Sequence, residues 1–154
     1  MSKAINPSLL RKSAARVAAV QYLFGYAQHT PTGYVSLLKK QLANNPAEQK
    51  LLYGGPYEPH YPLLEAILAG VAQWQADIDK RLETVLTKEW KRERMSALLV
   101  AILQCAIFEL FFFKDAKPAV IIDEYTRLTG RFFDEAETNF VYAALGTLAT
   151  RYTP

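Results

Sequence analysis

The sequence predicts an all-α fold built around one buried helix. Apolar residues recur at three- and four-residue steps, and no run alternates with a period of two for long enough to form a strand. The segment "ALLVAILQCAIFELFFF" at 97–113 contains one amide, Gln104, and one charge, Glu109. At least four other segments carry an apolar stripe along one side, and such a stripe needs a partner to cover it. We therefore expect these helices to surround the helix at 97–113.

A membrane span is the alternative interpretation of 97–113, and its length argues against it. Seventeen residues span roughly 25 Å as a helix, short of the roughly 30 Å hydrocarbon core of a bilayer. The flanking segments "KEWKRER" and "KDAK" are both net basic and give no orientation signal. The N-terminus lacks the features of a signal peptide, and the one cysteine, Cys105, fits a reducing compartment. We expect one cytoplasmic domain over residues 1–154.

The N-terminal half of this domain, 1–86, is expected to contain the first helices and a long loop. Asn6 is a good N-cap, and Pro7 stands at the first helical position, where its missing N–H costs nothing. "HTPTG" ends this helix, and a shorter one follows from about 34 to 44. The segment 44–62 holds four prolines and two glycines, which predicts a loop. Another helix begins just after Pro62 and continues beyond a bend. The residues expected to face inward are Leu10, Val17, Val20, Phe24 and Ala27, then Leu64, Ile67, Leu68, Val71, Trp74, Ile78, Leu82, Val85 and Leu86.

The C-terminal half, 87–154, is expected to contain the buried helix and two more. The buried helix should run from about 94 to 113, where "KDAKP" stops it. Pro118 starts the next helix. Asp134 can cap the last helix, with Glu137 three residues on as a variant of the capping box. The residues expected to face inward in these two helices are Ile121, Tyr125, Leu128, Phe132, Val141, Leu145 and Leu148.

Charge is distributed unevenly along the chain. The net charge is only +3, but no acidic residue precedes Glu48, and a second basic run, "KEWKRER", occupies 88–94. The segment 123–137 instead carries five acids and two arginines. This asymmetry suggests a polyanion on one surface and a different partner on another, although ordinary solvation accounts for many charge runs.

An enzyme, a metal site or a cofactor site finds little support in the sequence. His29 and His60 lie in predicted loops, and neither belongs to a pair with ligand spacing. Cys105 is surrounded by apolar residues, where a thiol usually acts as a small inert hydrophobe. Glu109 in the apolar helix either reaches its rim or is buried against a cation, and structural pairing is the favoured role.

The first helix carries the most informative polar cluster. Lys12 and Arg16 are four residues apart and share a face, while Arg11 projects elsewhere near the N-terminal end. All three lie outside the apolar stripe, so we expect them to stay exposed. Exposed cations near the free N–H groups of a helix start suit phosphates, and nearby aromatic residues could stack on unpaired bases. The alternative is that the three cations merely keep an apolar helix soluble.

Four segments occur in an order and spacing that match a known family. They are "RKSAARVAAVQYLFGYAQ", "LLEAILAGV", "LLVAILQCAIFEL" and "KPAVIIDEYTRLTGRFFDEAETNFVYAALGTLA". The most specific parts are the "AIFEL" turn, the helix entry with Pro118, Ile122 and Glu124, and the pair Phe140 and Val141. Over most of its length the chain resembles the NusB family of bacterial transcription antitermination factors.

The resemblance implies a helical bundle of two small subdomains packed on the buried central helix, without catalysis or cofactor. Family members bind the boxA element of nascent ribosomal RNA together with a small-subunit ribosomal protein, also called NusE, and the assembly joins the RNA polymerase elongation complex. A homodimer is a further assembly that the resemblance leaves open. On this chain, Arg11, Lys12 and Arg16 would contact phosphates. Asn139 and Phe140 would contact bases, although Phe140, like Phe132 and Phe133, could equally be a core residue.

The chain also departs from the family pattern. Ser13 and Ala14 stand where further cations are common, Gln104 where arginine is frequent, and Tyr142 and Ala143 where the family has Asn and Gly. Fewer phosphate contacts mean weaker and less salt-dependent RNA binding. One alternative is therefore a NusB-like protein-interaction module that has lost sequence-specific RNA binding. We disfavour a domain of the ribosomal RNA cytosine methyltransferases, since we expect no catalytic domain in this protein.

Overall fold

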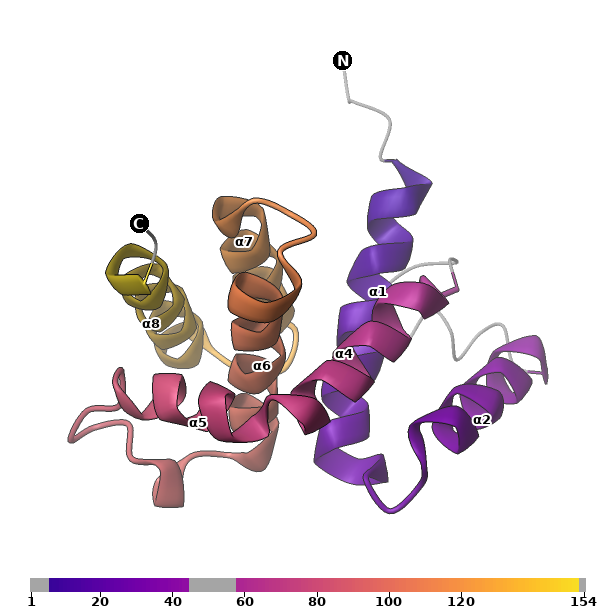
Figure 1. Cartoon of the computed structure of the whole chain (residues 1–154), viewed down its shortest axis with the longest axis horizontal. Coiled ribbons are helices and arrows are strands. Elements are labelled where there is room, and N and C mark those ends of the chain that lie inside the picture. Colours follow the sequence, from indigo (N-terminus) through magenta and orange to yellow (C-terminus); the bar gives the residue numbers. More distant parts are fainter. Residues whose placement is uncertain (1–5, 45–57, 153–154) are drawn as a thin grey trace. The chain divides into compact units, whose positions relative to one another are not determined.

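The computed structural model describes residues 6–44 and 58–152, and these residues form helices and no strands (Figure 1). This confirms the predicted all-α fold. Much of the loop predicted at 44–62 lies outside the described residues. The helices are α1 (Pro7–Gln21), α2 (Pro31–Asn44), α4 (Tyr61–Gln73), α5 (Gln75–Glu83), α6 (Ala97–Phe108), α7 (Pro118–Thr129) and α8 (Glu135–Tyr152), with π-helical turns at Tyr22–Tyr26 and Glu109–Phe113 and a 3-10 turn at Arg92–Arg94.

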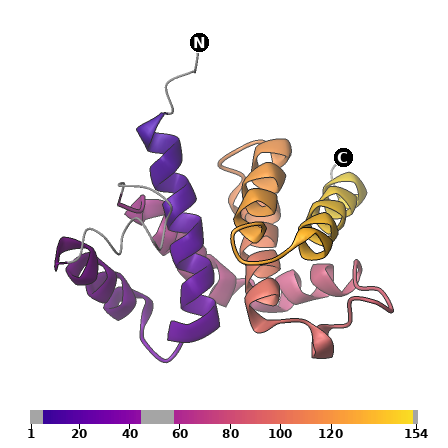
Figure 2. The ribbon, with the colours of Figure 1, turned by 180° about the vertical axis from the view of Figure 1, so that it is seen from behind.

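The chain divides into two compact units, and the division falls within α4. The first unit is Met1–Ala69 and the second is Gly70–Pro154. In the second unit α6 packs against α5, α7 and α8, and α5 runs crosswise to α6 (Figure 1 and, from behind, Figure 2). None of the helices in the described ranges combines the length and the apolar character that crossing a bilayer requires.

In the first unit, α1 begins as the sequence predicts, but near its end the side chains turn to a different side of the helix than an α-helical periodicity predicts. The Asn6 side chain accepts a hydrogen bond from the Ser8 N–H at 2.9 Å, which makes it the N-cap. Beyond Gln21 the helix widens into a π turn, and each residue of a π turn advances through a smaller angle than in an α-helix. Tyr22 is therefore buried while Phe24 is 56% exposed, so the prediction that Phe24 and Ala27 face inward was wrong.

Helix α2 starts three residues earlier than predicted. Thr30 caps its first turn, because the Thr30 hydroxyl accepts from the Gly33 N–H at 3.0 Å and its carbonyl accepts from the Tyr34 N–H at 2.8 Å. Pro31 then occupies the first helical position. The Tyr34 hydroxyl donates to the Ala18 carbonyl at 2.9 Å, which ties α2 to α1.

The core of the second unit is formed around α6, which is buried on nearly all sides. Ser96 caps α6 by accepting from the Leu98 N–H at 3.2 Å. The helix breaks at Trp74, where φ is −105° and ψ is 18°, and not between Ile78 and Leu82 as predicted, because α5 continues through both residues. Trp74 itself is 36% exposed, contrary to prediction. The buried residues of α6 are Leu99, Ala101, Ile102, Leu103, Cys105, Ala106, Ile107 and Phe108.

Helices α7 and α8 bury the predicted apolar residues with one exception. Helix α7 ends at Thr129, so Phe132 lies beyond it and is 37% exposed rather than inward-facing. The predicted capping box is also absent. The carbonyl of Asp134 accepts from the Thr138 N–H at 3.2 Å, while the Glu137 Oε2 is buried without a hydrogen-bond partner.

Candidate nucleic-acid interface

The three cations predicted on α1 do not share one environment. Arg11 is exposed, Lys12 is half-buried, and Arg16 is only 4% exposed. The prediction that all three stay exposed was therefore wrong for Arg16. From Ala14 to Val20 every residue of α1 is buried, so this part of the helix is covered on all sides and not along one stripe. Arg16 also takes part in an interaction within the protein.

A third cation, Lys39 of α2, is linked to Arg11 through the start of α4. The Arg11 carbonyl accepts a hydrogen bond from the His60 N–H at 2.9 Å, which holds the start of α4 beside the start of α1. The next residue, Tyr61, packs its ring under Lys39 of α2, with the Nζ atom 4.6 Å from the ring centroid. We call Arg11, Lys12 and Lys39 the basic face. Lys39 is distant along the chain and on another helix, so no local pattern could have assigned it.

The electrostatics of the first unit favour an anion at the basic face. Residues 1–69 contain seven lysines and arginines and three acidic residues, a net charge of +4, whereas residues 70–154 contain eleven and twelve, a net charge of −1. Burial, and secondarily the nearby Glu58 carboxylate, raises the pKa of Tyr61 to about 12. The Tyr61 phenol therefore stays neutral at physiological pH, and Glu58 is the acidic residue near this part of the basic face.

The two base-contacting candidates are neighbours in the second unit. Asn139 is exposed at the start of α8. Phe140 is only 8% exposed, and its ring stacks on Trp90 with a centroid distance of 4.6 Å and an interplanar angle of 11° (the two rings are almost parallel). Of the two roles that the sequence left open for Phe140, the structure therefore favours the core role.

His60, Cys105 and Glu109, for which the sequence offers little support for catalysis, are buried or take part in helix capping and hydrogen bonding. The His60 ring caps α4, since its Nδ1 accepts from the Leu63 N–H at 3.2 Å. Cys105 is fully buried, and burial together with the charge of Glu109 raises the pKa of its thiol. Glu109 is also fully buried, and its carboxylate accepts a hydrogen bond from the Tyr125 hydroxyl. Within 6–44 and 58–152, no three His, Cys, Asp or Glu side chains are grouped to hold a metal ion.

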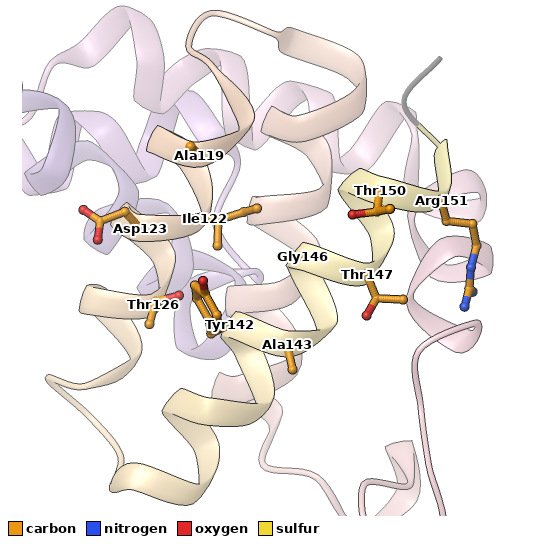
Figure 3. A pocket seen from close by; sticks show the side chains of 10 residues that line it. All are labelled: Ala119, Ile122, Asp123, Thr126, Tyr142, Ala143, Gly146, Thr147, Thr150 and Arg151. Atoms are coloured by element: carbon orange, nitrogen blue, oxygen red, sulfur yellow. The ribbon is translucent and has the colours of Figure 1, made fainter.

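A groove of about 1000 Å³ lies between α7 and α8, and none of these candidates is among its lining residues (Figure 3). Its charged groups are engaged with nearby groups: Asp123 pairs with Arg127 at 2.6 Å, and Arg151 donates to the Thr84 carbonyl at 3.3 Å. The groove brings no acid and base together for catalysis. Its lining residues are Ala119, Ile122, Asp123, Thr126, Tyr142, Ala143, Gly146, Thr147, Thr150 and Arg151.

Comparison with known proteins gives one consistent match. The model of the NusB family matches residues 13–150. A transcription antitermination protein NusB from Gluconobacter oxydans is 31% identical over 148 residues, covering 95% of this chain and 91% of that protein. The protein of the same name from Maricaulis maris is 39% identical over 90 residues, covering 58% of this chain and 56% of that protein. A third, from Bartonella tribocorum, is 30% identical over 148 residues, covering 92% and 89%.

Proposed function

The chain belongs to the NusB family of transcription antitermination proteins, and on this premise we propose that it binds a boxA-type RNA together with a small-subunit ribosomal protein of the NusE type. In this proposal the assembly acts on the RNA polymerase elongation complex in the cytoplasm. The chain contributes binding surfaces and no catalytic step.

The basic face is the observation that carries the proposal. Arg11 and Lys12 lie on α1 and Lys39 on α2, and the start of α4 contacts both helices through the Arg11–His60 hydrogen bond and the Lys39–Tyr61 contact. Cations that neutralise phosphates release condensed counterions, so they supply affinity that falls as salt rises. Phosphate contacts of this kind also set the register of the RNA, while exposed polar groups such as Asn139 can read base edges.

A second candidate function is a protein-interaction module without sequence-specific RNA binding. The burial of Arg16 favours it, because one of the three cations expected to meet phosphates is enclosed by the fold. The two candidates differ in a measurable way, since only the first predicts salt-dependent binding to a boxA RNA.

The test is a titration of a fluorescently labelled boxA RNA at several salt concentrations, with and without the ribosomal protein. Replacing Arg11, Lys12 and Lys39 by Ala should weaken binding and reduce the slope of log K against log salt by about two, at roughly 0.7 for each single-strand phosphate contact. The control removes three exposed cations of the second unit, Lys80→Ala, Lys117→Ala and Arg131→Ala.

The control variant loses the same formal charge, so it separates a local contact from an effect of net charge. Equal slopes for the two triple variants would contradict a role for the basic face. Binding of the ribosomal protein without any binding of boxA RNA would instead support the interaction module.

A further inference from the structure

The basic run at 88–94 forms a structured loop between α5 and α6. The Thr87 N–H donates to the Trp90 carbonyl at 3.3 Å, and the Trp90 N–H donates to the Thr87 hydroxyl at 3.2 Å. Arg92 pairs with Asp79 of α5 at 3.2 Å, and Asp79 also accepts from Gln104 of α6 at 3.1 Å. The loop is therefore attached to α5 at Asp79, the residue that also joins α5 to α6.

Trp90 lies in this loop with its indole supported from one side. The Phe140 ring stacks on it at 4.6 Å with an 11° interplanar angle, and Phe140 is 8% exposed while Trp90 is half-buried. Phe140 therefore cannot offer its own ring to a base. It can instead fix the orientation of an indole that still reaches the surface.

Two hollows meet beside this stack. One, of about 300 Å³, is lined by Phe140, Thr84 and Thr147 among others. The other, of about 840 Å³, is lined by Lys91 and Arg94 among others. Leu86 and Thr87 line both, so the two hollows adjoin. Phe140 thus connects the stack to these hollows, although Trp90 itself lines neither of them. The larger hollow combines its two exposed cations with the carboxylates of Glu83 and Glu93.

We propose that Trp90, supported by Phe140, is a stacking platform for one unpaired base of the bound RNA, with Lys91 and Arg94 contacting the flanking phosphates. This inference rests on the proposed function and assigns to Trp90 the base contact expected of Phe140. Single-stranded RNA is commonly bound by stacking of splayed bases on aromatic rings beside a cationic groove. The exposed Glu89 and Glu93 limit the attraction, so stacking contributes more here than charge does.

The chain contains a matched internal control. Trp74 stacks on Phe112 at 4.7 Å, also with an 11° interplanar angle, so its intramolecular environment resembles that of Trp90. Around Trp74, however, the Arg81 guanidinium lies over the Phe112 ring at 4.9 Å and over the Phe111 ring at 5.0 Å. This cation therefore packs on the protein's own aromatic rings, and we expect no base there.

Two single-tryptophan variants test the proposal by fluorescence. Trp74→Phe leaves Trp90 as the only indole, and Trp90→Phe leaves Trp74, because the sequence has two tryptophans. Saturating boxA RNA should quench the emission of the Trp74→Phe protein and leave the emission of the Trp90→Phe protein nearly unchanged. This measurement keeps Trp90 in place, so it does not depend on the fold tolerating its loss.

Affinity measurements separate stacking from charge. Trp90→Leu should weaken RNA binding about 10-fold with an unchanged salt slope, as expected for a lost stacking contact. Lys91→Ala with Arg94→Ala should instead reduce the slope by about one to two. The urea midpoint of each variant shows that it remains folded.

The possible failures are distinguishable. If RNA binds with the salt dependence of the basic face but neither Trp90 fluorescence nor the Trp90→Leu affinity changes, the platform is wrong and the proposed function stands. If no boxA RNA binds under any condition, both are overturned.

Discussion

Replacing Gly70 by Ala should destabilise the protein, although alanine is the better helix former. Gly70 lies in α4 directly against the ring of Phe108 in α6. A Cβ added at Gly70 would lie 2.0 Å from Cε1 and 2.2 Å from Cζ of that ring, whereas ordinary contact begins at 3.4 Å. The Phe108 ring would have to withdraw by roughly 1.4 Å. It is 4% exposed and stacks on Phe113 at 5.7 Å, so it has little space to do so.

The expected loss in the free energy of unfolding is the difference between two opposing effects. Overpacking of a dense core costs about 1–3 kcal/mol and occasionally more. Replacing glycine by alanine within a helix stabilises the folded state by up to about 1 kcal/mol, because alanine has the higher helix propensity. Because the added atom would approach the ring far inside its contact distance, we expect the upper part of the range, a net loss of about 2 kcal/mol in the free energy of unfolding.

Gly146→Ala in α8 is the matched control for this experiment. No heavy atom lies within 4 Å of a Cβ added at Gly146, so the helix-forming gain of up to about 1 kcal/mol should appear without a packing cost. Urea unfolding of both variants, followed by circular dichroism, gives the two changes on one scale.

The effects of substitutions at Gly70 and Phe108 on stability should also be coupled. Phe108→Leu alone should destabilise by leaving a cavity, but combined with Gly70→Ala the total loss should be smaller than the sum of the two single losses. A Gly70→Ala protein as stable as the wild type, or strictly additive losses in the double variant, would refute the close approach of α4 to the Phe108 ring.

Three further predictions concern buried polar groups. Tyr125→Phe removes a donor to the fully buried Glu109 carboxylate and should cost about 1–3 kcal/mol, measured by urea unfolding; a neutral effect would contradict the importance of that bond. The pKa of Tyr61 is about 12 against an ordinary 10.0, so the unfolded state loses its proton first and stability should fall as pH rises between these values. Tyr61→Phe should flatten that fall, and an identical pH profile would count against the raised pKa. Cys105 is fully buried with a raised thiol pKa, so a thiol reagent should label it only upon unfolding, and rapid labelling of the native protein would argue against this burial.

The sequence alone was sufficient to predict the all-α class, the positions of most helices and the apolar helix at the centre of the second unit. Asn6 with Pro7, and Pro118, mark helix starts through local chemistry, since the groups that cap or begin a helix lie within a few residues of one another. The inward-facing residues of α8, including Val141 and Leu145, also followed from periodicity, because one side of that helix is buried as the pattern assumes.

Only the tertiary structure decided which polar and aromatic residues are available to a ligand. Arg16 lies off the apolar stripe of α1 yet is buried, because α1 is covered on all sides at that level. Lys39 is linked to Arg11 only because the start of α4 contacts both α1 and α2. Phe140 stacks on Trp90 only because the loop at 84–96 contacts α8. Helix-forming preference depends on neighbours along the chain. Exposure depends on neighbours in space, and a single periodic pattern carries no information about them.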